Sequence, residues 1–200
     1  MVLGTALIFG ALFLFAHNEN ESTEAENIRA SVVPQLMEVI VEKVEEATEA
    51  PTYAQPLGTP LEYLEPSAFE MTEVVIDGYA YIGYLSIPKL SLDLPVMADW
   101  DYKRLKIAPC HYAGSVRGED LVIMAHNYKS HFSQLSKLKE GDSVVFTDMD
   151  GIVTTYMVVA QDILAPSAVE EMTAGVFDLT LFTCTYGGKS RLTVYCDRVP

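Results

Sequence analysis

The stretch LTLFTCTYGGKSRLTV, residues 179–194, joins two apolar, β-prone segments through a short turn with two glycines. Alternate residues of a strand share a face, so Phe182 and Cys184 point to the same side. Arg191 opens the second segment and returns beside the cysteine. The stretch predicts a β-hairpin and raises a question about Cys184. By position alone, a free cysteine is more often a buried structural thiol than a nucleophile.

Four further segments have the same β-prone texture. They are residues 79–88, 120–126, 142–148 and 151–164, in addition to 177–184 and 191–199 around the opening stretch. Turn residues separate them, and only short helices fit between, near residues 102–106 and 132–138. Many short strands at this spacing favour a closed barrel or a sandwich, so the fold class is mainly β.

Charge and cysteine content exclude several classes of function. The net charge is -15, and residues 18–73 hold 13 acidic and 2 basic side chains. Without a basic patch, no nucleic-acid partner is expected. The three cysteines lack zinc-ligand spacing, and the pairs Glu119-Asp120 and Glu170-Glu171 fit solvated turns better than a calcium cage. We therefore expect no metal and no cofactor.

The amino terminus is apolar, and residues 1–16 carry no charge. As a helix they span roughly 24 Å, short of the ~30 Å hydrocarbon core. They fit a membrane anchor with a missing upstream part, the core of a cleaved signal peptide, or a buried helix. The anchor is favoured, because a basic start, a small-x-small cleavage site and a polar helical face are all missing. The first two interpretations place the rest outside the cytoplasm, which also agrees with the acidic segment that follows.

Residues 20–49 have apolar positions at helical spacing, with Pro34 three residues after Ser31. This pattern predicts one kinked helix or two successive helices. A solvated acidic spacer is the favoured interpretation, and a helix packed on the β domain is the alternative. Residues 50–67 hold four of the ten prolines and predict an extended linker. The predicted organisation is therefore an anchor (1–17), an acidic helical and linker segment (18–72) and a mainly β domain (73–200), which the family resemblance described below makes a β-barrel.

A nucleophilic cysteine needs a base, and acyl transfer needs a group that stabilises the oxyanion. His126 ends the apolar run DLVIMAH, so a buried strand presents it at its tip, as another strand presents Cys184. Arg191 carries a fixed fork of donors that suits a carbonyl oxygen. The alternative pair, Cys110 and His111, consists of adjacent strand residues that point to opposite faces. Cys184, His126 and Arg191 are therefore the candidate catalytic residues.

These pieces occur in the order found in sortases, the cysteine transpeptidases of Gram-positive cell surfaces. TLFTC, ending at Cys184, resembles their T-L-x-T-C motif. IMAHN resembles the segment around their catalytic histidine, although Ala125 stands where glycine is usual. The His-Asn pair in it resembles class B. Three other stretches also resemble the family, namely YIGYLSIPKLSLDLPV (81–96), HFSQLSKLKEGDSVVF (131–146) and RLTV (191–194).

The resemblance covers residues 79–199 and implies a closed eight-stranded β-barrel behind an amino-terminal membrane anchor. It implies that Cys184 attacks a sorting-signal peptide of secreted proteins, that His126 transfers protons and that Arg191 steadies the oxyanion. The thioester then passes to an amine on a peptidoglycan precursor or a pilin. Expected substrate-binding residues are Thr183, Asn127, Tyr128 and Tyr186.

Two further expectations concern the remaining cysteines and the reaction. Outside the cell, Cys110 and Cys196 are a candidate disulfide that leaves Cys184 as the odd thiol. A thiol hydrolase without transfer, or a non-catalytic surface β-module, are the alternatives to a transpeptidase. Papain-type hydrolases place the cysteine before the histidine, which is the reverse of the order in this chain. A non-catalytic module has no reason to bring Cys, His and Arg together.

Overall fold

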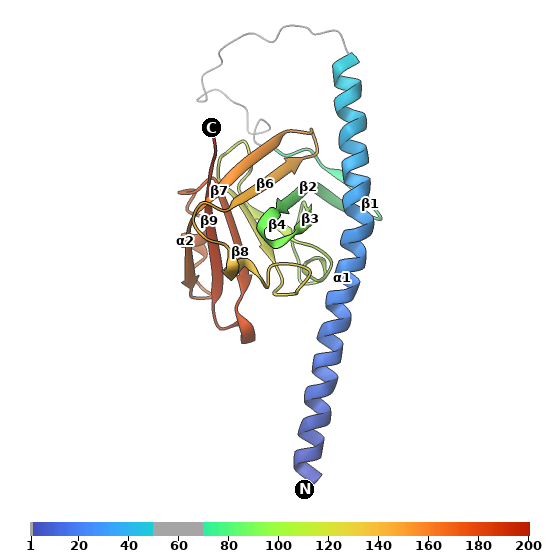
Figure 1. Ribbon diagram of the computed structural model, residues 1–200, viewed down its shortest axis with the longest axis vertical. Helices are drawn as coiled ribbons and strands as arrows, with labels where there is room; N and C mark the ends of the chain where they lie inside the picture. Colours follow the sequence, from blue (N-terminus) through green and yellow to red (C-terminus); the bar gives the residue numbers. More distant parts are fainter. Residues whose placement is uncertain (1, 50–69) are drawn as a thin grey trace.

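The computed structural model describes residues 2–49 and 70–200, so the predicted linker lies outside the described residues. Figure 1 shows a long helix, α1 (Val2–Glu49), running along one side of a β-barrel. The strands are β1 Val74–Ile76, β2 Tyr79–Ile87, β3 Leu92–Met97, β4 Cys110–Ala113, β5 Leu121–Ala125, β6 Ser143–Asp148, β7 Val153–Leu164, β8 Leu179–Cys184 and β9 Arg191–Arg198. The short helices are η3 Pro88–Leu90, η4 Arg104–Lys106, η5 Leu135–Lys137, α2 Val169–Met172 and η6 Tyr186–Gly188.

Eight strands close into a ring in the order β2-β3-β4-β5-β8-β9-β7-β6, and β6 pairs back with β2. The short strand β1 pairs with β2 outside the ring. Two neighbouring pairs, β3–β4 and β5–β8, are parallel, and the other pairs are antiparallel. The predicted mainly β, closed eight-stranded barrel is confirmed. Closure pairs the backbone groups that a sheet edge leaves free.

Alternation along β8 is as predicted and defines the two faces of the barrel wall. Leu179 and Leu181 lie in the main core inside the barrel. Phe182 faces outward into a separate apolar cluster with Val122 and Met172. Cys184, two residues after Phe182, therefore lies on the outer face. All six predicted strands match observed strands within two residues at each end, whereas β1, β3 and β4 were not predicted from periodicity.

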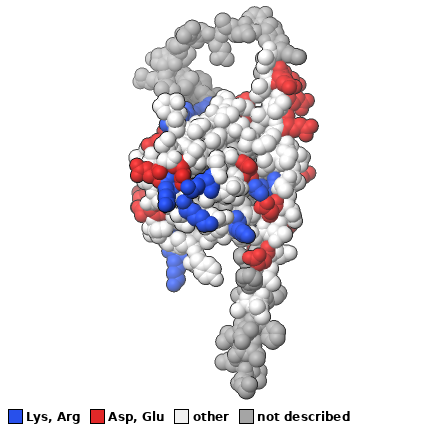
Figure 2. All heavy atoms as spheres, viewed as in Figure 1, with Lys and Arg blue, Asp and Glu red and all other residues white. Residues whose placement is uncertain are grey.

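The helix α1 packs on the barrel, so the favoured interpretation as a solvated spacer was wrong. Val32, Leu36 and Ile40 are buried in a cluster that also contains Tyr81 and Met97 of the barrel. The helix buries this apolar stripe, and its acidic residues Glu38, Glu42, Glu45 and Glu46 are exposed. Figure 2 shows acidic side chains gathered on the carboxyl-terminal part of α1. The sequence shows both the apolar and the acidic positions of this helix. The structure shows that the apolar positions pack against the barrel.

A single helix continues through Pro34 instead of ending or restarting there. An interior proline removes one backbone hydrogen bond and costs about 3 kcal/mol. Burial of one large aliphatic side chain contributes roughly 1.5–3 kcal/mol, and three of them are buried beside Pro34. Packing on the barrel therefore outweighs the local cost of the proline.

The helix also runs across the predicted boundary between residues 17 and 18 without interruption. Within residues 2–49 and 70–200, no helix is both long enough and apolar enough to cross a membrane. The division into segments 1–17, 18–72 and 73–200 stays a prediction.

Candidate active site

Three neighbouring strands bring the three candidate catalytic residues into one row. β5 and β8 are parallel, and Ala125 pairs with Thr183, so His126 and Cys184 follow at the same level of the wall. β8 and β9 are antiparallel, and Cys184 pairs directly with Arg191. Adjacent strands lie about 4.8 Å apart, and side chains in one row across a sheet point to the same face. The row His126, Cys184 and Arg191 is therefore set by strand register.

All three side chains line one cavity of about 130 Å³ on the outer face of the barrel. Its walls are mainly apolar and come from the segment before β4, from β4, β5 and β8, and from α2. The apolar wall residues are Trp100, Tyr102, Leu105, Tyr112, Met124, Ala125, Pro166, Val169, Met172 and Phe182. A cavity with such walls shields a thiol from bulk water and can receive an apolar group beside it.

The aromatic wall of the cavity was not predicted from the sequence. Trp100 lies with its ring centroid 5.5 Å from that of Tyr112, and Tyr112 meets Phe182 edge-on at 5.2 Å. Met172 comes from α2, a four-residue helix too short for a periodic signal. The outward position of Phe182 beside Cys184 was the one available clue. The partners that cover it come from distant parts of the chain.

The turn between β8 and β9 holds Arg191 close to Cys184. The Thr185 backbone N–H donates to the Ser190 carbonyl at 2.9 Å, which closes the loop. Gly187 and Gly188 have φ values of 80° and 71°, which favour glycine, and this explains the pair in the motif. The Arg191 Nη1 donates to the Gly188 and Ser190 carbonyl oxygens at 3.4 and 3.3 Å. The guanidinium is thus held at the rim of the cavity.

The four predicted substrate-binding residues have different environments. Thr183 lines the cavity, but its hydroxyl donates to the Ala125 carbonyl at 2.8 Å and ties β8 to β5. Tyr128 is buried, whereas Tyr186 is 97% exposed and Asn127 is partly exposed. Among the described residues, Asn127, Tyr128 and Tyr186 do not line the cavity with Cys184. Their predicted contact with substrate stays a prediction.

The proposed disulfide between Cys110 and Cys196 is corrected, because both thiols are free and buried. Cys110 lies on β4 and Cys196 on β9, with β5 and β8 between them. Three inter-strand spacings amount to about 14 Å, and a disulfide requires Cα atoms within about 7 Å. Burial raises the pKa of each of these two thiols to about 12. Neither thiol is suited to form a thiolate.

The alternative pair of Cys110 and His111 has no active-site geometry. The Cys110 thiol donates to the Ala108 carbonyl at 3.4 Å. The two ring nitrogens of His111 lie 3.1 Å from the Ala98 carbonyl oxygen and 2.8 Å from that of Gly114. Backbone contacts therefore engage both rival side chains. In the described part of the chain, no cluster of three or more His, Cys, Asp or Glu side chains could hold a metal ion.

His126 sits partly buried at the end of β5. Burial lowers the pKa of His126, and the Glu21 carboxylate of α1 opposes this shift. Its ring stacks on Tyr128 with centroids 4.8 Å apart and planes 29° apart. The ring makes no hydrogen bond to any residue that the structure describes, so both nitrogens are free for proton transfer. The neutral ring can accept a proton, as a base for an attacking amine must.

His131 gives the first prediction, which concerns acid stability. It is buried, its Nδ1 has no partner among the described residues, and burial lowers its pKa from 6.5 to about 4. Between these pH values the unfolded chain binds a proton that the folded chain does not. Acid therefore favours unfolding, and the free energy of unfolding should fall by about 3 kcal/mol between pH 6.5 and pH 4. Urea denaturation across this range measures the loss.

His131→Phe keeps a planar ring of similar size and removes the titrating group. The variant should lose less free energy of unfolding than the unsubstituted chain between pH 6.5 and pH 4. An equal loss in both proteins would show that other groups cause the acid sensitivity.

Comparison with protein families matches residues 85–199, more than half of the chain, to the sortase domain. The chain belongs to the sortase family. It is a cysteine transpeptidase, which cleaves a sorting signal and transfers the acyl group to an amine, in anchoring to the cell wall or in pilus building. A search of curated proteins found no match.

Solved structures agree with this assignment. The sortase C1 of Streptococcus suis is 31% identical over 60% of this chain and 73% of its own, with a TM-score of 0.54. The sortase C1 of Streptococcus agalactiae is 32% identical over 63% and 71%, with a TM-score of 0.55. The sortase C of Streptococcus pneumoniae, at 24% identity and a TM-score of 0.61, covers 84% of this sortase and 96% of its own chain, and shows the shared fold. The class B resemblance of the His-Asn pair stays a prediction.

Proposed function

We propose that Cys184, His126 and Arg191 carry out the transpeptidation. The observation that supports this most strongly is their single row across β5, β8 and β9, which opens into one apolar cavity. The proposal assigns the nucleophile to Cys184, proton transfer to His126 and stabilisation of the oxyanion to Arg191. These are the three tasks that acyl transfer through a thioester requires.

In the first half-reaction, the Cys184 thiol gives its proton to His126, and the sulfur attacks the scissile carbonyl carbon of the sorting signal. Arg191 donates hydrogen bonds to the oxygen that becomes negative. The carbon–nitrogen bond then breaks, and the departing amine takes a proton from His126. The product is a thioester between Cys184 and the amino-terminal part of the substrate.

In the second half-reaction, an acceptor amine attacks the thioester carbonyl. His126, now neutral, takes a proton from this amine, and the carbon–sulfur bond breaks to regenerate Cys184. The proton balance closes, because His126 passes the thiol proton to the leaving amine in the first half and passes the proton of the acceptor amine back to the Cys184 sulfur in the second. We propose that the acceptor is an amine of a peptidoglycan precursor or a lysine of a pilin.

The proposed location is the outer face of the cell membrane, with the apolar amino-terminal segment as the anchor. Support comes from the uncharged residues 1–16 and from the acidic segment that follows them. In intact cells, added protease should cleave the barrel, and the chain should fractionate with membranes. Full protection of the barrel in intact cells would contradict this location.

The test of transfer is to incubate the purified full chain with a library of carboxyl-terminal sorting-signal peptides. Mass spectrometry identifies the cleaved bond and the acyl-enzyme. We expect that adding a pilin-derived lysine peptide or a peptidoglycan stem peptide moves product from the free acid to the amide. The acyl group reaches the amine only if the thioester persists until the amine arrives. If only the free acid forms at saturating amine, the chain acts as a hydrolase under these conditions.

A further inference from the structure

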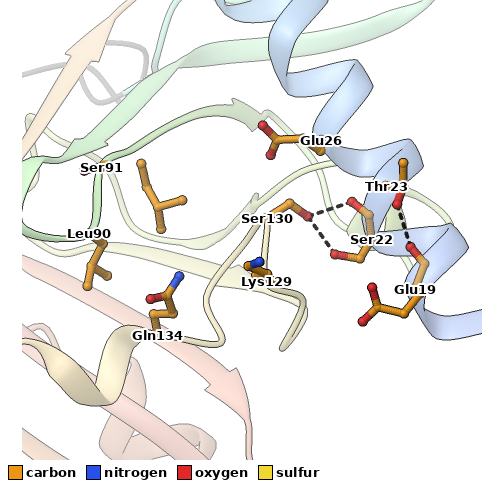
Figure 3. Close-up of a pocket in the computed structure, with 10 residues that line it drawn as sticks. Glu19, Ser22, Thr23, Glu26, Leu90, Ser91, Lys129, Ser130 and Gln134 are labelled. Carbon is orange, nitrogen blue, oxygen red and sulfur yellow. Dashed lines mark hydrogen bonds between the residues drawn. The ribbon is translucent and has the colours of Figure 1, made fainter. Parts of the chain in front are cut away.

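The helix α1 holds the loop that follows His126. Tyr128 donates its phenol hydrogen bond to the Glu21 carboxylate at 2.7 Å. Two residues on, the Ser130 hydroxyl donates to the Ser22 carbonyl at 3.1 Å and lies 3.4 Å from the Ser22 hydroxyl. Figure 3 shows both serine contacts between helix and loop. Two adjacent helix residues, Glu21 and Ser22, thus bind Tyr128 and Ser130 of the loop.

The contact between helix and loop consists of a few polar bonds. A cavity of about 430 Å³ lies beside it, as Figure 3 shows, and helix and loop both line this cavity. Its lining residues are Glu19, Ser22, Thr23, Glu26, Leu90, Ser91, Leu92, Lys129, Ser130 and Gln134. Open space therefore adjoins the loop on this side, and the hydrogen bonds to Glu21 and Ser22 hold the loop to the helix. Removal of a single hydrogen bond should therefore free the loop measurably.

Tyr128 links this contact to the ring of His126. Its own ring lies between two imidazoles, 4.8 Å from His126 and 5.5 Å from His131. Since the His126 ring has no hydrogen bond within the described part of the chain, the Tyr128 ring is the aromatic face against which it rests. The position of Tyr128 in turn depends on Glu21, the partner of its hydroxyl group.

Glu21 is itself held in place. Lys106 of η4 binds the other carboxylate oxygen at 2.6 Å, and His17 lies 3.4 Å from the same oxygen. The hydrogen bonds from Lys106 and Tyr128 lower the pKa of Glu21, so the carboxylate is ionised. Leu105, next to Lys106, lines the cavity that contains Cys184. Glu21 therefore joins α1, η4 and the His126 loop at one point.

We propose that Glu21 and Tyr128 are positioning residues for His126, so that α1 is part of the catalytic machinery. The proposal rests on the proposed role of His126 in proton transfer. Proton transfer requires the imidazole nitrogen within about 3 Å of the reacting atoms, and a misplacement of about 1 Å can cost up to 100-fold in rate. Glu21 fixes the Tyr128 ring, and the Tyr128 ring fixes the orientation of His126.

The test measures kcat and KM for peptide cleavage and for transfer in three variants of the full chain. Tyr128→Phe keeps the stacked ring and removes only the hydrogen bond, and Glu21→Ala removes the acceptor. Both should lower kcat about tenfold and leave KM for the peptide within twofold. Glu21→Gln keeps an acceptor oxygen and should restore most of kcat. A purely structural defect would not be rescued in this way.

The double variant, Glu21→Ala with Tyr128→Phe, gives a sharper readout. If the two residues act through one hydrogen bond, the double variant should lose about as much kcat as either single variant. Losses that multiply would overturn the proposal, and so would an unchanged kcat in Tyr128→Phe. Because Tyr128→Phe removes a single oxygen atom and keeps the ring, it decides the question even if Glu21→Ala folds poorly.

Matched controls are Glu24→Gln on the exposed side of the same helix and Tyr84→Phe on β2, which does not line the cavity that contains Cys184. Both should retain the kcat of the unsubstituted chain. His126→Ala distinguishes the role of His126 in proton transfer from the positioning of its ring. If His126→Ala is inactive while Tyr128→Phe and Glu21→Ala are fully active, only the positioning proposal fails. If His126→Ala is itself active, the proposed role of His126 fails.

Discussion

Replacement of Cys184 by alanine should abolish the acyl-enzyme and lower turnover by at least roughly 10⁴-fold, since the nucleophile of a covalent mechanism has no substitute. Intact-mass spectrometry with a sorting-signal peptide detects the thioester, and chromatography of the products measures turnover. Cys184 is the one partly exposed cysteine of the three in the sequence. It also lines the cavity with His126 and Arg191.

The matched controls are Cys110→Ala and Cys196→Ala. Both thiols are buried, with pKa values raised to about 12, and two strands separate them. Each variant should form the acyl-enzyme at the rate of the unsubstituted chain, with some loss of stability from the smaller side chain. If Cys184→Ala still forms a covalent adduct with the peptide, the nucleophile has been assigned wrongly.

Replacement of His126 by alanine should lower kcat about 10³-fold, within the range of general acid–base catalysis. Both half-reactions depend on this residue, because it protonates the first leaving amine and deprotonates the second amine. Rapid-quench measurement of thioester formation and, separately, of aminolysis should show both rates reduced. A loss confined to one half-reaction would limit His126 to a single proton transfer.

His111→Gln is the control for the histidine. Its ring contacts two backbone carbonyls and faces a different cavity from that of Cys184. The variant should retain both rates within about threefold, the scale of a small local adjustment. If His111→Gln is impaired as strongly as His126→Ala, the alternative pair of Cys110 and His111 would need to be reconsidered.

Much of the barrel could be predicted from the sequence, because strands with one buried face alternate every two residues. The pattern in β8, with Leu179 and Leu181 inside and Phe182 outside, is an example. β4 has only four residues and was not predicted from periodicity, since so short a segment carries too little pattern. The register that aligns His126 with Cys184 is likewise a property of two strands that lie far apart in the chain.

For the candidate site, too, the reactive residues could be predicted from the sequence, and their contacts with remote segments could not. Cys184, His126 and Arg191 were predicted from their places at strand ends and from the sortase motifs. Tyr128 was also selected, but for contact with substrate, and the structure places it between His126 and Glu21 of α1. No local pattern connects Tyr128 with a helix residue 107 positions earlier.

The mainly β class, the family and the residues suited to the chemistry could be predicted from the sequence, because periodicity and motifs are local properties of the chain. The packing of α1 on the barrel and its contact with the His126 loop became visible in the three-dimensional structure. The structure also shows that Cys110 and Cys196 stay apart and free. These outcomes depend on which surfaces meet when the barrel closes. Burial and distance between remote segments decide them, and neither is encoded at a single position.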